Sequence, residues 1–244
     1  MIKTKASDRL IVALDTSSLD EAERMIVELK DLIGMFKIGL ELYTKYGLEV
    51  FNLIGKHEIK VFFDCKMMDI PNTIARASKN LVGRNVAMFN LHATGGFEMM
   101  RAAREAVEEE AKKNNLEKPL IIAVTILTSM SEKELKEEQS VSIPIEEQVK
   151  NLAKLTERAG LDGVVASAQE AGLIREATND QFLIVTPGIR PSWAEANDQS
   201  RIVTPGQALK NGSSHLVVGR PITGAENRVA AARKIVDEIE EALS

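Results

Sequence analysis

The feature that most constrains the fold is a set of eight short apolar runs distributed along the 244 residues of the chain. These runs are rich in β-branched residues and nearly continuous rather than alternating, which is typical of parallel strands covered by helices on their outer face. We expect strands over residues 10–15, 35–40, 60–65, 88–93, 120–127, 163–168, 182–188 and 215–220.

Amphipathic segments with helical spacing lie between these runs. Residues 18–33 carry apolar side chains along one helical face, and Ser18 with Glu21 predicts a capping box at the start. Ser131 with Glu134 predicts a second capping box. Other helices are expected over residues 72–84, 96–113, 144–160 and 228–243.

Eight strand-then-helix units in a chain of this length predict a (β/α)8 barrel, an α/β fold. A doubly wound open sheet is the alternative. That fold usually has fewer strands, and no glycine-rich dinucleotide turn follows the first predicted strand. We therefore favour the barrel and expect residues 1–244 to form a single barrel domain.

The charge and composition of the chain exclude several classes of partner. The net charge is −5 and no long basic tract occurs, so neither nucleic acid nor an anionic membrane surface is expected as a partner. No stretch reaches the ~18 apolar residues of a membrane-spanning helix, and the first residues contain no apolar signal core. The single cysteine, Cys65, rules out an intrachain disulfide. We expect a soluble, cytoplasmic protein.

Polar residues recur where the predicted strands end. In a (β/α)8 barrel the C-terminal ends of the strands form one face, and the catalytic groups of barrel enzymes lie there. The polar residues at these positions are Asp15, Lys37, Asp64, Lys66, His92, Thr128, Ser129, Arg190 and Arg220.

The densest group of charges follows the run VFF, where Asp64, Lys66 and Asp69 lie within six positions. Asp64 and Lys66 are two residues apart, so a continuing strand would place both on the face that points into the barrel mouth. There they can form a partly desolvated ion pair. Residue type alone leaves simpler alternatives, namely a structural ion pair at the rim and Asp69 as the N-cap of a helix that begins near Pro71. Cys65 would face the covering helices and serve packing.

Residues 64–73, DCKMMDIPNT, resemble the D-x-K-x-x-D signature of the orotidine 5′-monophosphate decarboxylase family. The signature alone is shared with metal-dependent sugar-phosphate enzymes. Cys65, Met67 and Met68 depart from the commoner DLKFHD, but at variable positions. Other segments resemble the family in the same order along the chain, and they are LIVALD (10–15), FKIG (36–39), LHATGG (91–96), LTSM (127–130), TPGIRP (186–191), DQSRIVTP (198–205) and VVGRPIT (217–223).

The resemblance implies loss of CO2 from C6 of the orotate ring, without a metal or an organic cofactor. The resulting carbanion lies in the ring plane and cannot be delocalised, so fixed charges must stabilise it. By resemblance, Lys37, Asp64, Lys66 and Asp69 form an alternation of charge. Lys66 stabilises and then protonates C6, Asp64 lies near the departing carboxylate and holds Lys66, and Lys37 holds Asp64. In a homodimer, Asp69 and Thr73 would reach into the partner's site.

Substrate binding is implied by the same resemblance. Barrel phosphate sites often form from the last two loops, where glycine admits backbone N–H groups and arginine supplies paired donors. Arg220 and Gln199 would contact phosphate, with Arg190 in the same site. Without the resemblance, Arg190 could be a surface salt bridge, and Thr128 with Ser129 could cap the helix near Ser131. The substrate-binding residues implied are Asp15, Lys37, Asp64, Ile70, Thr73, Thr128, Ser129, Pro187, Arg190, Gln199, Gly219 and Arg220.

Two other functions compete with this interpretation. The first is a metal-dependent decarboxylase or aldolase that acts on a sugar phosphate, in which a carboxylate binds Mg²⁺ to stabilise an enediolate. That function gives Thr128, Ser129 and Gln199 no pyrimidine nucleotide to contact. The second is a catalytically inactive barrel that binds a phosphate ligand as a regulator. The intact Asp64, Lys66 and Asp69 argue against it.

Overall fold

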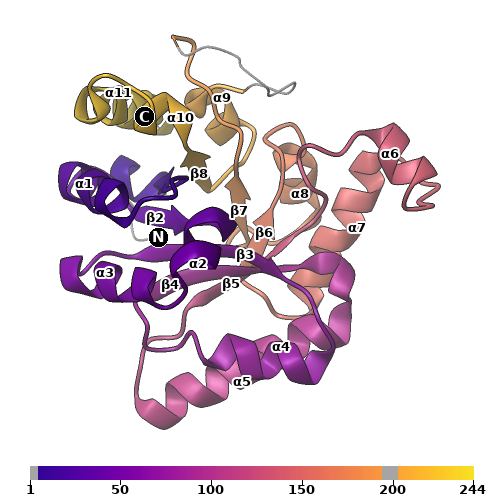
Figure 1. Ribbon diagram of the computed structural model, residues 1–244. Coiled ribbons are helices and arrows are strands. Elements are labelled where there is room, and N and C mark those ends of the chain that lie inside the picture. The colour runs from indigo at the N-terminus through magenta and orange to yellow at the C-terminus, as the bar shows by residue number, and fades with distance from the viewer. Residues whose placement is uncertain (1–4, 194–202) are drawn as a thin grey trace.

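The eight strands close into a parallel barrel (Figure 1). The computed structural model describes residues 5–193 and 203–244. Each strand pairs with the next along the chain, and β1 pairs with β8, so the predicted barrel is confirmed and the open sheet is excluded. The strands are β1 (Leu10–Ala13), β2 (Met35–Ile38), β3 (Val61–Met67), β4 (Val86–His92), β5 (Leu120–Val124), β6 (Gly163–Val165), β7 (Leu183–Thr186) and β8 (His215–Val218).

Helices surround the barrel on its outside (Figure 1). The five helices predicted from apolar spacing are present, and they are α1 (Leu19–Leu29), α4 (Pro71–Lys79), α5 (Phe97–Asn114), α7 (Ile145–Arg158) and α11 (Arg228–Leu243). Shorter helical elements complete the connections, and they are η1 (Ala6–Arg9), α2 (Leu40–Tyr46), α3 (Glu49–His57), η2 (Ala93–Gly95), α6 (Glu132–Glu137), α8 (Ala171–Ala177), α9 (Pro205–Lys210) and α10 (Arg220–Thr223). Within the described ranges, no helix is long and apolar enough to cross a membrane.

The two predicted capping boxes have different outcomes. Ser131 accepts from the backbone N–H of Glu134, and the Glu134 carboxylate accepts from the N–H of Ser131 at 2.7 Å, so this box is confirmed. Ser18 accepts from the N–H of Glu21 at 3.3 Å, but the return bond is missing. The Glu21 carboxylate instead pairs with Arg24 and Arg228. The capping box predicted at Ser18 is therefore only half formed, because nearby guanidinium groups hold the Glu21 carboxylate that would complete it.

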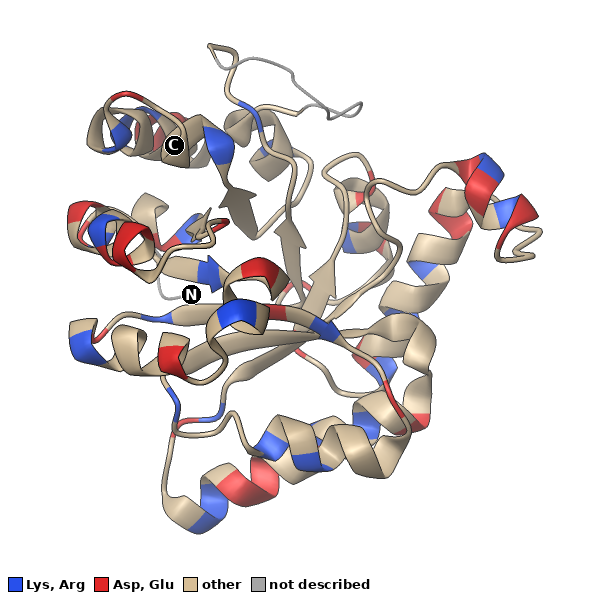
Figure 2. Cartoon of the chain, viewed as in Figure 1, with Lys and Arg blue, Asp and Glu red and all other residues tan. Residues whose placement is uncertain are grey.

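Apolar side chains fill two layers, one inside the barrel and one between the strands and the helices. The interior layer includes Ile11, Phe62 and Met88, each almost fully buried. The larger outer layer joins the other face of the strands to the helices. Strand side chains alternate between these layers, so both faces of each strand are apolar. The strands are accordingly mostly uncharged in Figure 2, and charge appears on β2 and β3 near their C-terminal ends.

Candidate active site

The C-terminal end of β3 departs from regular pairing. Phe63 pairs with Phe89 of β4, and the next pair is Met67 with Leu91, so between these pairs β3 has three residues where β4 has one. Lys66 lies in this bulge with a φ of 49°, in the left-handed region that non-glycine residues rarely occupy. The regular strand expected through Asp64 and Lys66 is therefore wrong in detail. The bulge turns the chain so that these two side chains still meet.

Four charged side chains form what we call the mouth cluster, which consists of Asp15, Lys37, Asp64 and Lys66. Lys66 Nζ lies 2.7 Å from Asp64 Oδ1, and Lys37 Nζ lies 3.4 Å from Asp64 Oδ2. Lys37 also reaches Asp15 Oδ1 at 3.1 Å. The side chains of Lys37 and Asp64 are each 12% exposed, whereas that of Lys66 is 31% exposed. The ammonium group of Lys66 is thus the more accessible cation at the mouth.

The environment of Asp64 keeps its carboxylate charged. Burial alone would raise the pKa of Asp64, but the charges of Lys37 and Lys66 and hydrogen bonds from Lys66 and Asn90 outweigh burial and lower this pKa below its usual value. Asp64 is therefore an anion at neutral pH.

Asp69 lies outside the mouth cluster of its own chain. Its carboxylate is exposed, and Oδ1 accepts from the N–H of Ile70 at 2.7 Å. Ile70 is the N-cap of α4 and Pro71 is its first residue, so the alternative of Asp69 as the N-cap is wrong. Thr73 and Ile70 are exposed as well. Within one chain, the predicted alternation includes Lys37, Asp64 and Lys66, with Asp15 as a fourth charge.

The loop after β7 has a defined base. Gly188 takes a φ of 78° next to the half-buried Pro187, and Ile189 forms a parallel bridge with Val203. Arg190 is 4% exposed, and its guanidinium donates to the Ile189 carbonyl at 3.0 Å. The alternative of Arg190 as a surface salt bridge is therefore wrong. Gln199, predicted to cover the phosphate, lies outside the described residues.

The end of β8 lies beside the mouth cluster. A Cβ atom built on Gly219 would come 3.6 Å from Asp15 Oδ2, so this glycine passes close to the carboxylate. Gly219 is the N-cap of α10, and the exposed Arg220 is its first residue. The structure thus brings three predicted residues, which follow the ends of β1 and β8, to one part of the rim.

Thr128 and Ser129 are exposed in the turn that follows β5. The side chain of Ser131 caps α6, so the alternative of Thr128 and Ser129 as caps of this helix is wrong. Their hydroxyl groups remain available at the rim.

Cys65 and His92 flank the charged residues. Cys65 packs against the outer apolar layer, as predicted, and burial followed by the charge of Asp64 raises the pKa of its thiol to about 12. Burial, reinforced by Lys66, lowers the pKa of His92. The thiol is therefore protonated at neutral pH and His92 is uncharged, so neither adds charge to the mouth.

Asn90 was missed by the sequence analysis. Its side chain is fully buried, donates to Asp64 Oδ1 at 2.7 Å and accepts from the backbone N–H of Lys66 at 2.7 Å. The signal was present, because Asn90 is a polar residue inside the apolar run MFNLHA. A buried amide needs hydrogen-bond partners, and the charged strand end beside it supplies them.

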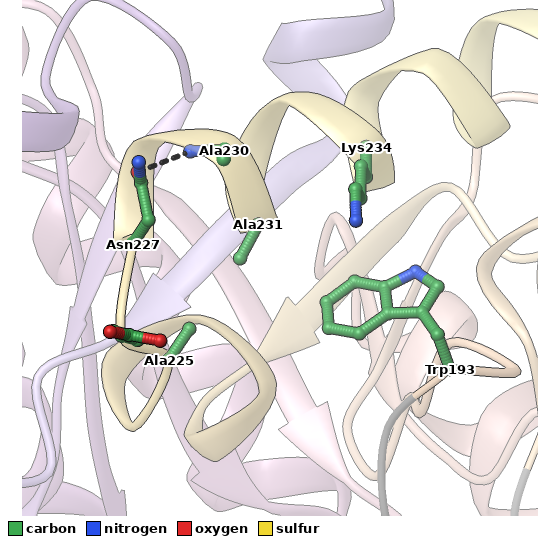
Figure 3. A pocket seen from close by; sticks show the side chains of 7 residues that line it. Trp193, Ala225, Asn227, Ala230, Ala231 and Lys234 are labelled. Carbon is green, nitrogen blue, oxygen red and sulfur yellow. Dashed lines mark hydrogen bonds between the residues drawn. The ribbon is translucent and has the colours of Figure 1, made fainter.

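A cavity of about 540 Å³ lies between Trp193 and the start of α11 (Figure 3). Lys234 lies over the Trp193 ring at 5.5 Å, and Asn227 caps the helix by accepting from the N–H of Ala230. Among the described residues, none of the predicted site residues lines this cavity.

Residues 5–193 and 203–244 contain no group of three His, Cys, Asp or Glu that could hold a metal ion.

Comparison with known proteins identifies the family. The model of the Orotidine 5'-phosphate decarboxylase / HUMPS family matches residues 8–235. The chain belongs to this family. The resemblance of the motifs to orotidine 5′-monophosphate decarboxylases is thereby confirmed.

Individual members of the orotidine 5'-phosphate decarboxylase family match over nearly the whole chain. A relative named orotidine 5'-phosphate decarboxylase from Moorella thermoacetica is 48% identical over 240 residues, which cover 98% of this chain and 95% of the relative. One of the same name from Syntrophotalea carbinolica is 50% identical over 239 residues, 98% of each chain. The crystal structure of orotidine 5'-phosphate decarboxylase from Lactobacillus acidophilus is 36% identical, with a TM-score of 0.83 over 94% of this chain and 98% of that one.

Proposed function

We propose that this chain is a cytoplasmic enzyme that decarboxylates orotidine 5'-monophosphate to uridine 5'-monophosphate, the last step of de novo UMP synthesis, without a metal or an organic cofactor. The observation that carries this proposal is the mouth cluster, in which Asp64 lies between the two cations Lys37 and Lys66. Family membership and the relatives named above support the substrate.

The reaction needs a localised negative charge to be stabilised at C6. The bond between C6 and the carboxylate breaks heterolytically, the electron pair stays on C6, and CO2 leaves. The ammonium group of Lys66 stabilises this pair and then donates a proton to it, and solvent reprotonates the amine. Lys66 suits this role because its ammonium is the more exposed cation of the cluster and is already fixed by Asp64. Preorganised charge of this kind is a large source of rate acceleration.

Asp64 and Lys37 hold Lys66 in place. The carboxylate of Asp64 stays ionised because two ammonium groups offset its burial, so it fixes Lys66 without taking its proton. Lys37 contacts the ribose together with Asp15, whose carboxylate lies at the exposed edge of the cluster.

The rest of the nucleotide binds around the rim. Arg220 and the backbone at Gly219 bind the phosphate, together with Gln199, and Pro187 and Arg190 form the base of this loop. Thr128 and Ser129 bind the amide edge of the pyrimidine from the exposed turn after β5. Binding energy from the phosphate, which is remote from C6, contributes to the rate by closing the site.

A homodimer completes each site. Asp69, Ile70 and Thr73 are exposed on the single chain, next to the mouth but outside its cluster. We place Asp69 and Thr73 of one protomer at the substrate of the other. The neighbouring apolar side chains of Met68 and Ile70, 56% and 66% exposed, fit burial at such an interface.

The test is the loss of orotate ultraviolet absorbance when purified protein meets orotidine 5'-monophosphate in excess chelator. A rapid fall supports the proposed reaction. No fall in chelator, followed by turnover of a keto-sugar phosphate when Mg²⁺ is restored, would replace the proposal by the metal-dependent sugar-phosphate reaction and would leave Thr128, Ser129 and Gln199 without a pyrimidine to contact.

A further inference from the structure

Asn90 occupies the one position of β4 that faces the bulge in β3. The paired residues on either side are Phe63 with Phe89 and Met67 with Leu91, so Asn90 stands opposite Asp64, Cys65 and Lys66. On its other side, Asn90 pairs regularly with Ile122 of β5. The backbone of Asn90 is therefore fixed by a regular ladder, while its side chain is directed at an irregular strand.

The amide oxygen of Asn90 replaces a backbone acceptor. At the bulge the regular ladder of β3 and β4 is interrupted, and the N–H of Lys66 donates to Asn90 Oδ1 at 2.7 Å. A buried N–H needs such an acceptor. This bond holds Lys66 at its φ of 49°, which a lysine would otherwise avoid.

The amide nitrogen of Asn90 fixes the other member of the pair. Asn90 Nδ2 donates to Asp64 Oδ1 at 2.7 Å, and the same oxygen accepts from Lys66 Nζ at 2.7 Å. The second oxygen, Oδ2, faces Lys37. One buried side chain thus sets the backbone of Lys66 and the orientation of the Asp64 carboxylate that receives the Lys66 ammonium.

We propose that Asn90 is a positioning residue for the decarboxylation, acting through Asp64 and Lys66 to aim the ammonium of Lys66 at C6. The proposal rests on the proposed function. Asn90 needs no contact with the substrate, so its removal misplaces the reacting ammonium and leaves the phosphate and ribose contacts intact. A displacement of about 1 Å in a reacting group lowers a rate by roughly 10²-fold.

The experiment compares the unsubstituted protein with Asn90→Ala, Asn90→Asp and the control Thr156→Val, using orotidine 5'-monophosphate turnover and thermal unfolding. Thr156 is also fully buried, but its hydroxyl donates to Leu152 within α7. Asn90→Ala is expected to lower kcat by about 10²-fold with little change in KM. Thr156→Val removes a buried hydrogen bond as well and is expected to leave kcat unchanged.

Asn90→Asp keeps the size of the side chain and supplies a second readout, the pH profile. Its carboxyl can still accept from the N–H of Lys66, but its other oxygen meets Asp64 Oδ1. Two facing carboxyl groups share a proton at low pH, and ionisation of both is disfavoured. The other titratable neighbours are Lys37, Lys66, Cys65 and His92. The two lysines oppose this repulsion, and the raised pKa of the Cys65 thiol keeps it uncharged. The kcat of Asn90→Asp is expected to fall with rising pH, relative to the unsubstituted protein.

The outcomes separate the two proposals. No turnover by the unsubstituted protein would overturn the proposed function, and the positioning role with it. Turnover by the unsubstituted protein with an unchanged kcat in Asn90→Ala would overturn the positioning role alone. If Asn90→Ala does not fold, Asn90→Asp decides, because a pH profile parallel to that of the unsubstituted protein would refute the role. The role would also be refuted if the loss of kcat in both Asn90 variants were fully explained by a smaller fraction of folded protein.

Discussion

Buried titratable groups at the two ends of the barrel differ in charge state. At the mouth, burial disfavours the Asp64 carboxylate, yet Lys37 and Lys66 lower its pKa and keep it charged. At the opposite end, where the strands begin and which we call the floor, His215 is the first residue of β8. Burial, and then the charge of the nearby Arg9, lower the pKa of His215 to about 4. Nδ1 of His215 is buried and has no hydrogen-bond partner among the described residues. His215 is therefore neutral at pH 7.

The difference follows from the sign of the neighbouring charges. Burial favours the uncharged form of both groups, and the two ends differ in whether the nearest ions oppose or reinforce that preference. At the mouth, opposite charges fix an ion cluster that can act on a substrate. At the floor, a like charge reinforces burial, so a neutral ring packs at the start of a strand. The proposed function uses the first arrangement, and the second is expected to affect the pH dependence of stability.

The largest effect on activity is expected when the two residues of the proposed shared site, Asp69 and Lys66, are substituted in different protomers. Asp69→Ala and Lys66→Ala should each be inactive alone, because each removes one charge from every site. When they are mixed in equal amounts and allowed to exchange subunits, half of the dimers are mixed, and one of the two sites in a mixed dimer is intact. About a quarter of the unsubstituted activity should return. Specific activity after mixing is the measurement, and no recovery despite exchange would refute the shared site.

A smaller effect is expected when one cation is removed from Asp64. In Lys37→Met the pKa of Asp64 should rise, because Lys37 is the leading charge that offsets its burial. The acid limb of kcat/KM should move to higher pH, and the value at pH 7 should fall by roughly 10²-fold. The pH–rate profile measures both. Lys56→Met is the matched control, since Lys56 pairs with Glu23 on the surface. An unshifted acid limb in Lys37→Met would contradict the assigned balance of charge.

The smallest effect on activity is expected at the floor. The pKa of His215 in the folded chain, about 4, lies below its usual value of about 6.5, so the unfolded chain binds more protons between these pH values. The free energy of unfolding should therefore fall as the pH drops from about 6.5 to about 4, by up to about 3 kcal/mol from His215 alone. In His215→Asn this loss should be absent, while kcat at pH 7 is unchanged. Urea unfolding at several pH values measures it, and parallel pH dependence in both proteins would contradict the assignment.

The sequence predicted the barrel because the strands are apolar on both faces and recur eight times. The boundaries were less accurate at the functional end. Residues 10–15 and 215–220 were expected to be strands, but β1 ends at Ala13 and β8 at Val218, so Asp15 lies in the loop after β1 and Arg220 begins α10 at the rim. α2 and α3 escaped prediction because Gly47, with a φ of 57°, ends the first after seven residues.

The sequence predicted which residues come together at the site more accurately than it predicted how the backbone arranges them. Spacing placed Asp64 and Lys66 together, as found, but through a bulge rather than a regular strand. No local pattern signals a left-handed lysine, because that conformation depends on a hydrogen bond that the Lys66 N–H donates to Asn90, 24 residues away. Asp69 lies outside the mouth cluster of its own chain, and the proposal that it reaches a partner's substrate involves a second protomer, which the spacing within one chain does not define.

The most direct test of the account is single-turnover decarboxylation of orotidine 5'-monophosphate by Lys66→Ala, measured as CO2 release in chelator beside the unsubstituted protein. The account predicts a folded protein whose rate is lower by more than about 10⁴-fold, because both the charge that stabilises C6 and the proton donor are removed. A rate within about tenfold of the unsubstituted protein would show that another group acts at C6 and would contradict the account.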